Sequence, residues 1–148
     1  MVFVKIFELF KIIFFIYKKM NRQLFFIRET KKVVSLILNN NKKRIGQVRF
    51  SPPCPHNYPT TAYIHKIHVV PDYRNKNIGS HLLKHMNLYL KENTNAKKVS
   101  GVLWDDTTNP FLSEFFKKNG YTLFNNGQDF YDDGENIIEI IPLELKFN

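Results

Sequence analysis

Apolar and polar positions divide the chain into segments with two different periods. Three apolar segments, at residues 23–29, 31–40 and 42–50, have the length of strands, and the asparagines at 39–41 with the lysines after them predict the turn between the last two. Residues 51–60 hold four of the seven prolines, which predicts a loop. The three segments are therefore expected to form an antiparallel meander.

The segment 61–70 predicts the next strand, which ends at Pro71 and Asp72. From Ile78 to about Glu92 the apolar spacing becomes helical. One face of this expected helix collects apolar side chains, namely Ile78, Leu82, Leu83, Met86 and Leu90. A strand, a tight turn and a helix are thus expected to follow directly on one another.

The rest of the chain returns to strands. Residues 97–104 predict a buried strand, 109–120 a short helix with Gly120 at its C-cap, and 121–124 and 136–147 the closing strands. The order is three strands, then β-α-β-α, then two strands. It predicts an α/β fold in which a mixed, mostly antiparallel central sheet is flanked by helices, with its β-α-β-α core at residues 61–121.

Residues 1–19 have the pattern of an amphipathic helix, with lysines on one side and phenylalanines and isoleucines on the other. The longest unbroken apolar run, IIFFIY, has six residues, whereas a membrane-spanning helix needs about 20. Three interpretations stay open. The helix packs on the domain or on a second copy of the chain in a homodimer, it lies on a membrane surface, or it is an extension ahead of a translation start at Met20.

Composition indicates one globular domain, which we place at residues 20–148. The chain has 148 residues, of which 43% are hydrophobic and 24% charged, so it can bury one core. Its single cysteine, Cys54, excludes an internal disulfide and a cysteine-based zinc site. We expect a soluble, cytoplasmic protein, and the many Asn, Lys, Ile and Phe residues, whose codons are AT-rich, indicate an AT-rich genome.

Charge is unevenly placed along the chain. The net charge is +9, yet residues 101–148 contain three basic and nine acidic residues, so the first hundred residues carry +15. Such a segment attracts phosphates, an anionic cofactor, nucleic acid or an acidic membrane, although a solvated basic surface has the same composition. The lysines are scattered and no nucleic-acid-binding signature accompanies them, so no specific nucleic-acid partner is expected.

The segment 67–86, IHVVPDYRNKNIGSHLLKHM, places a basic turn of small residues between the end of a strand and the start of a helix. Successive backbone N–H groups point out of such a turn, and the helix dipole adds partial positive charge, so a pyrophosphate can be held mainly by main chain. The turn lacks the Lys-Ser/Thr ending of a nucleotide P-loop and the three glycines of a dinucleotide fingerprint. It therefore indicates an anion site of another kind.

This stretch resembles the acetyl-CoA site of the GNAT superfamily of acyl-CoA N-acyltransferases, whose signature is Arg/Gln-x-x-Gly-x-Gly/Ala. The corresponding residues in this chain are Arg74, Asn75, Lys76, Asn77, Ile78, Gly79 and Ser80. The segment 109–121, NPFLSEFFKKNGY, resembles the family's Asn-x-x-Ala-x-x-Leu-Tyr-x-Lys-x-Gly-Phe segment. The resemblance covers residues 61–121, but the helices that the family usually has between its first and second strands are not evident here. Residues 1–19 are a candidate to replace them.

The resemblance implies a set of cofactor contacts. The phosphates of acetyl-CoA would sit on the turn, and the backbone of Ile67, His68 and Val69 would pair with pantetheine and donate an N–H to the thioester carbonyl. Asn109 would hydrogen-bond the pantetheine arm, or else it is simply the N-cap of a helix ahead of Pro110.

Two positions depart from the family pattern. Asn77 stands where the family has its first glycine, and asparagine is the non-glycine residue that best tolerates a left-handed backbone. Phe116 stands where the resemblance predicts the tyrosine that protonates the departing thiolate. A general acid contributes about 10² to 10⁴ in rate, and helps least when the leaving group is stable. Water, Ser113 or Tyr121 is a candidate to donate the proton instead.

Acetyl transfer to an amine also needs a base, because a lysine-like amine is almost wholly protonated at neutral pH. His65, two residues before Ile67 on the same strand, is the candidate, since histidine titrates in the right range. A histidine that only packs on a sheet surface would have the same position in the pattern. His68 should face the opposite side unless a bulge intervenes. Asp105 and Asp106 would attract a cationic substrate, or are ordinary turn residues.

The sequence therefore predicts an N-acetyltransferase that moves an acetyl group from acetyl-CoA to a primary amine of a small molecule or protein. The alternative is a CoA-binding module with weak or no turnover, because Phe116 replaces the tyrosine. No metal site is expected, because the five histidines include one helical i, i+4 pair, His81 and His85, and no glutamate accompanies it as in a zinc protease.

Overall fold

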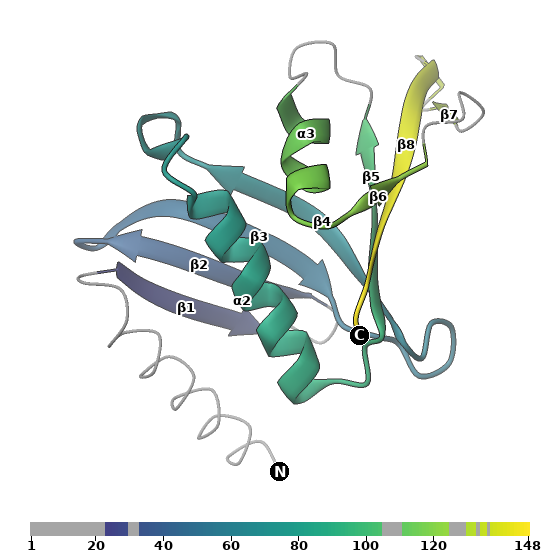
Figure 1. Ribbon diagram of the computed structural model, residues 1–148, viewed down its shortest axis with the longest axis horizontal. Coiled ribbons are helices and arrows are strands. Elements are labelled where there is room, and N and C mark those ends of the chain that lie inside the picture. The colour runs from purple at the N-terminus through teal and green to yellow at the C-terminus, as the bar shows by residue number, and fades with distance from the viewer. Residues whose placement is uncertain (1–22, 30–32, 105–110, 125–129, 133, 136) are drawn as a thin grey trace. The chain divides into compact units, whose positions relative to one another are not determined.

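The computed structural model describes residues 23–29, 33–104, 111–124, 130–132, 134–135 and 137–148 (Figure 1). The chain forms two compact units. The first consists of Met1–Ser51 and His65–Tyr89, and the second of Pro52–Ile64 and Leu90–Asn148. One strand and one helix begin in one unit and end in the other. The expected N-terminal helix at 1–19 lies outside the described residues.

The first unit is built on an antiparallel meander of β1 (Gln23–Glu29), β2 (Val34–Asn40) and β3 (Lys43–Ser51), as the apolar pattern predicts (Figure 1). β1 and β2 pair over their full lengths, and only residues 30–33 separate them. Helices of the kind implied by the family resemblance therefore have no room between these two strands. On its other side β3 is followed by β4 (Thr61–Val69), of which residues 65–69 belong to this unit.

A two-residue turn connects β2 to β3. Asn41 and Lys42 have φ angles of 49° and 66°, so both residues take the left-handed conformation. Hairpins favour this turn because its twist matches that of the flanking strands. Asparagine enters the left-handed region readily, whereas the Lys42 backbone is held there by the strand pairing on both sides.

Helix α2 (Ile78–Asn93) buries the face that its sequence predicts, because Ile78, Leu82, Leu83, Met86 and Leu90 are all buried. In the first unit it packs against β3. A Cβ atom on Gly46 would lie 3.0 Å from Leu82 Cδ1 and 3.3 Å from Ile78 Cγ2, and the Phe50 and Tyr89 rings meet edge to face with centroids 5.6 Å apart. The missing side chain at Gly46 thus lets the helix approach the strand closely.

The second unit has strands of its own. Thr61–Tyr63 of β4 pair in parallel with Lys98–Ser100 of β5 (Lys98–Trp104). β5 pairs antiparallel with β8 (Ile137–Lys146), which also pairs with β6 (Thr122–Leu123) and β7 (Phe130–Asp132). The strands expected at 97–104, 121–124 and 136–147 are confirmed, and β7 was not expected.

Pro142 lies inside β8 without breaking its pairing to β5. Its carbonyl accepts a hydrogen bond of 2.8 Å from the Phe124 N–H, on the side of β6. The N–H and C=O of one residue in an antiparallel strand point to the same side, so the donor that proline lacks would also have faced β6. The β6 ladder ends at Leu123, and the β5 ladder continues past Pro142 to Ile140.

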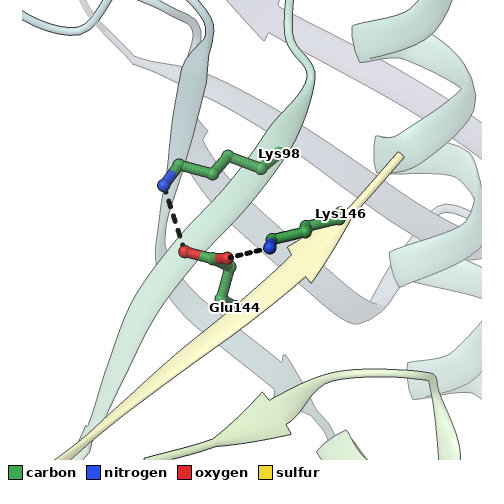
Figure 2. Close-up of polar contacts among 3 residues, drawn as sticks. All are labelled: Lys98, Glu144 and Lys146. Atoms are coloured by element: carbon green, nitrogen blue, oxygen red, sulfur yellow. Dashed lines mark hydrogen bonds and ion pairs between the residues drawn. The ribbon is translucent and has the colours of Figure 1, made fainter. Parts of the chain in front are cut away.

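Charged side chains connect the ends of β5 and β8 (Figure 2). The Glu144 carboxylate lies 3.1 Å from Lys98 Nζ, and its other oxygen lies 4.0 Å from Lys146 Nζ. Lys98 and Lys146 are opposite one another in the strand register, so Glu144 separates two like charges that would otherwise repel. Glu144 is largely buried and the shorter contact is a hydrogen bond, which makes it the stronger of the two.

Helix α3 (Phe111–Lys118) ends in the glycine cap that the sequence predicts. Gly120 has a φ of 88°, its N–H donates to the Lys117 carbonyl, and the Tyr121 N–H donates to the Phe116 carbonyl. These two bonds form a Schellman motif, in which the residue after the glycine usually contacts the third-last helical residue. Here that contact joins the Tyr121 and Phe116 rings, whose centroids are 5.2 Å apart.

Replacement of Gly101 on β5 by alanine is expected to lower the free energy of unfolding by about 1–3 kcal/mol, the usual cost of overpacking a core. The added Cβ would lie 2.5 Å from Cγ2 of buried Ile64 and 3.3 Å from Leu143 Cδ1. Chemical denaturation measures the change. Ser100→Ala, on the preceding residue of the same strand, is the control and should alter stability by less than about 0.5 kcal/mol. Equal denaturation midpoints for the two variants would contradict the close packing at Gly101.

No helix within the described ranges combines the length and the apolar character needed to cross a membrane.

Candidate functional site

The turn between β4 and α2 lies entirely within the first unit, and backbone hydrogen bonds fix its start. The Val70 N–H donates to the Ile45 carbonyl at 2.9 Å, which holds the end of β4 against β3. A short 3-10 helix, η1 (Pro71–Tyr73), follows, and it is closed by hydrogen bonds from Tyr73 N–H to Val70 O and from Arg74 N–H to Pro71 O. The residues from Arg74 onward therefore start from a defined position.

Two asparagines then reverse the chain in the left-handed conformation. Asn75 has a φ of 60° and Asn77 a φ of 62°. The expectation that Asn77 tolerates the conformation of the glycine it replaces agrees with this geometry. Asn75 does the same two residues earlier, although the family signature has no glycine at this position. Alternation of left-handed and ordinary residues is the geometry in which consecutive backbone N–H groups form an anion-binding concavity.

Helix α2 begins directly after Asn77. The first intrahelical hydrogen bond runs from the His81 N–H to the Asn77 carbonyl, at 3.0 Å. The amides of Ile78 and Gly79 precede that bond, so neither has an acceptor within the helix. With the positive end of the helix dipole, they make this end of α2 attractive to an anion.

Two cationic side chains flank the turn. Arg74 Nε donates to the Val69 carbonyl at 2.9 Å, which holds the guanidinium at the end of β4. Lys76 Nζ lies 5.3 Å from the centre of the Tyr73 ring, within the range of a cation–π contact. Both residues are exposed. The turn thus joins aligned backbone dipoles, two left-handed residues and two positive charges on a single short segment.

His65 of β4 makes a short contact to the end of β3. Its Nε2 lies 2.6 Å from Ser51 Oγ. Partial burial of the ring and the positive charge of Arg49 lower the pKa of His65 from its ordinary value of 6.5. Both effects disfavour the imidazolium, so His65 is neutral at pH 7 and has one ring nitrogen able to accept a proton.

The alternation of β4 does not continue to its end. Ala62 and Ile64 are buried with Tyr63 exposed between them, but His65 and Lys66 are both exposed. The exposed side chain of His68 follows a half-buried Ile67. The expectation that His65 and His68 lie on opposite faces assumes that side chains alternate along the whole strand. In β4 this alternation ends at Lys66.

Ser51 and Arg49 were not singled out by the sequence. Each stands in an ordinary strand pattern, and His65 follows Ser51 by fourteen positions, with a proline-rich loop between them. Only the return of the chain through that loop brings the end of β3 beside β4. A serine just before a Pro-Pro pair carries no signal that could have indicated this contact.

The second unit contains the other candidate residues that the structure describes. Phe116 is 3% exposed and meets the Phe115 and Tyr121 rings edge to face, with centroids 5.3 Å and 5.2 Å away. Ser113, on the same helix, is half-buried. Phe116 therefore fills an aromatic cluster, in a place where a hydroxyl would have to find a partner. Asp105, Asp106 and Asn109 lie outside the described residues.

The Tyr121 hydroxyl is buried and makes no hydrogen bond within the described part of the chain. Burial raises the pKa of Tyr121 well above its ordinary value of 10.0. The phenol therefore stays protonated over the whole physiological range, and its raised pKa makes it a weak proton donor.

Tyr121→Phe is expected to raise the free energy of unfolding by up to about 1 kcal/mol, because it removes a buried polar group that has no partner and keeps the ring. Tyr121→Leu is the matched control, and it should destabilise the protein because the edge-to-face contact with Phe116 is lost. Thermal and chemical denaturation measure both. A clear loss of stability in Tyr121→Phe would show that the hydroxyl has a partner.

No group of three histidine, cysteine, aspartate or glutamate side chains in the described segments is placed to hold a metal ion. His81 is exposed on α2 and His85 is half-buried.

Comparison with protein families finds a match to the acetyltransferase (GNAT) domain over residues 24–123. None of the curated protein sequences matches the chain. Among solved structures, a GNAT family acetyltransferase from Elizabethkingia anophelis with acetyl-CoA bound has a TM-score of 0.63 and 16% identity, over 86% of this chain and 100% of that one.

Two further structures have the same fold. The ribosomal-protein-S18-alanine N-acetyltransferase from Escherichia coli has a TM-score of 0.60 and 17% identity, over 80% of this chain and 71% of that one. The PaiA N-acetyltransferase from Thermoplasma acidophilum in complex with coenzyme A has a TM-score of 0.58 and 19% identity, over 78% of this chain. This chain spans 62% of the Thermoplasma chain, which is less than two thirds. At these identities the likeness is one of fold.

Proposed function

This chain belongs to the GNAT family of acetyltransferases, and we propose that it transfers an acetyl group from acetyl-CoA to a primary amine by direct attack of the amine on the thioester. The observation that carries the proposal is the turn between β4 and α2. There Asn75 and Asn77 take the left-handed conformation ahead of the first turn of α2. The acceptor is an amine of a small molecule or a protein.

The turn suits the pyrophosphate of acetyl-CoA. Ile78 and Gly79 supply backbone N–H groups, the helix dipole adds positive charge, and Arg74 and Lys76 stand beside them. Ser80 completes the run of small residues that lets phosphate oxygens approach the backbone. Acetyl-CoA supplies the activated acyl group, and the chain has to hold it, orient the amine and move a proton.

Ile67, His68 and Val69 are proposed to bind the pantetheine arm. The parallel pairing of β4 with β5 covers Thr61–Tyr63 and ends four residues before Ile67. Pantetheine amides can then pair with this part of β4 in the manner of an added strand. An N–H of the same segment would stabilise the oxyanion that forms at the thioester carbonyl. Asn109 is proposed as a further contact to this arm.

His65 is proposed as the base. The attacking amine must lose a proton, and the partial burial of His65 with the charge of Arg49 keeps the ring neutral and ready to accept one. Asp105 and Asp106 are proposed to attract the cationic form of the amine before it reacts. That proposal agrees with the net acidic charge of residues 101–148.

Departure of CoA needs no strong acid in this proposal. Phe116 supplies no proton, and burial makes the Tyr121 phenol a poor donor. A thiol with an ordinary pKa of about 8.5 leaves tolerably as the thiolate, so water can protonate it afterwards, and the half-buried Ser113 is proposed to relay that proton. We therefore propose a working enzyme, slower than one with a hydroxyl at position 116.

Calorimetric titration with acetyl-CoA tests the proposal, with Gly79→Trp as the control variant. The tryptophan ring would occupy the approach to the turn, so micromolar binding should be lost while the far-ultraviolet circular dichroism spectrum stays unchanged. A screen of amines that detects release of free CoA thiol follows. Binding together with acetyl transfer supports the enzyme, and binding without transfer identifies a CoA-binding module. No binding by the unaltered protein would overturn the proposal.

A further inference from the structure

We propose that Ser51 is a catalytic residue of this reaction, whose hydroxyl passes the proton of the attacking amine to Nε2 of His65. The proposal rests on the function proposed above. It assigns a direct role to a residue that neither the sequence pattern nor the family resemblance indicates.

Geometry supports the direction of the hydrogen bond between the two residues. The Ser51 Oγ to His65 Nε2 distance is 2.6 Å. This is shorter than the usual N–H···O range of about 2.7–3.2 Å and is typical of a hydroxyl donor. In the proposed arrangement the Ser51 hydroxyl donates to Nε2, which places the proton of the imidazole on Nδ1.

The electrostatic surroundings favour the same arrangement. The neutral ring must keep a lone pair on Nε2 to accept from Ser51, and the charged group acting on it from β3 is the Arg49 guanidinium, which opposes protonation. Along β4 the titratable neighbours of His65 are Tyr63 and Lys66, and Lys66 adds a further positive charge. His65 thus stays an acceptor until a proton is delivered to it.

Ser51 occupies a fixed position at the end of β3. It is the last residue of β3 and is half-buried, so its hydroxyl is accessible and its backbone is held by the strand. A hydroxyl that donates to Nε2 keeps a lone pair for an incoming N–H group.

The proton transfer needs only the neutral amine, Ser51 and His65. As the amine nitrogen forms its bond to the acetyl carbon, one of its protons moves to Ser51 Oγ and the Ser51 proton moves to Nε2. The bond between the acetyl carbon and sulfur then breaks, and CoA leaves as the thiolate, which takes a proton from water. Ser51 is regenerated and His65 becomes the imidazolium, which later releases the proton to solvent. The Ser51 hydroxyl carries this proton better than a free water molecule does. The strand already holds the hydroxyl in position, whereas a water molecule must first be ordered.

The test combines kinetics with titration of His65 by nuclear magnetic resonance, on the full-length protein. Ser51→Ala is expected to lower kcat by about 10²-fold with little change in the acetyl-CoA dissociation constant, and Ser51→Thr should restore most of the rate. The double variant with His65→Ala should be no slower than His65→Ala alone, because the two residues act as a unit. Ser100→Ala, on a half-buried strand serine of the second unit, is the control.

The titration measures the direction in which the pKa of His65 changes, which a purely structural role of Ser51 would not predict. Ser51→Ala removes a donor that favours the neutral ring, so the pKa of His65 should rise. A fall would mean that Nε2–H donates to Ser51, which overturns the relay. A kcat near that of the unaltered protein would overturn it too. If the unaltered protein transfers no acetyl group, the proposed function fails and the relay with it, whereas transfer with an unaffected Ser51→Ala variant overturns the relay alone.

Discussion

Replacement of His65 by alanine is expected to lower kcat for amine acetylation by about 10²- to 10⁴-fold, the usual contribution of a general base. The neutral imidazole is the proton acceptor in the proposed reaction, and its Nε2 lies 2.6 Å from Ser51 Oγ. The dissociation constant for acetyl-CoA should stay within about twofold, because the phosphate turn is not altered. Steady-state kinetics and calorimetry measure the two quantities separately.

His56→Ala is the control for this result, because His56 is an exposed histidine in the proline-rich loop. It should leave both the rate and the affinity unchanged. If His65→Ala keeps more than about a tenth of the rate, a water molecule takes the proton and His65 is a surface residue of the sheet.

The same residue sets the expected dependence on pH. Burial and Arg49 hold the pKa of His65 below 6.5, so kcat at saturating amine should be constant at neutral pH and fall only when the pH drops below 6.5. Arg49→Gln removes the positive charge, so the fall in kcat should begin at a higher pH. That pH should stay below 6.5, because burial remains and is the larger cause of the lowered pKa. The unfolded chain binds this proton more readily than the folded one, so acidification below 6.5 also lowers stability.

Asn77→Pro is expected to weaken acetyl-CoA binding by about a hundredfold, because proline cannot reach a positive φ. The ring fixes φ near about −65°, whereas Asn77 has a φ of 62°. The turn would have to rebuild between Lys76 and the first residues of α2, and the amides of Ile78 and Gly79 would change direction. Calorimetry with acetyl-CoA measures the loss.

Asn77→Gly is the matched control, since glycine enters the left-handed region at no steric cost. It should bind acetyl-CoA as tightly as the unaltered protein. Circular dichroism and denaturation of both variants separate a local change of the turn from loss of the fold. Equal affinity of Asn77→Pro and Asn77→Gly would show that the turn does not hold the phosphates.

The sequence by itself determined the elements whose cause is local. Apolar spacing predicted the meander and the buried face of α2 from Ile78 to Leu90, because the periods of a strand and a helix are set by backbone geometry. Gly120 predicted the end of α3, because the left-handed cap needs a residue without Cβ. The signature around Asn77 and Gly79 predicted the position of the turn, since strand, turn and helix are contiguous in the chain.

Tertiary structure decided what depends on residues far apart in the sequence. The three-residue strand β7 has too short a pattern to be seen, and its pairing partner β8 defines it. The Ser51–His65 contact, the charge of Arg49 on His65 and the burial of the Tyr121 hydroxyl arise where distant segments meet. A local pattern records which face of an element is buried, but a proton path depends on single distances, and those are set only when the strands take their register.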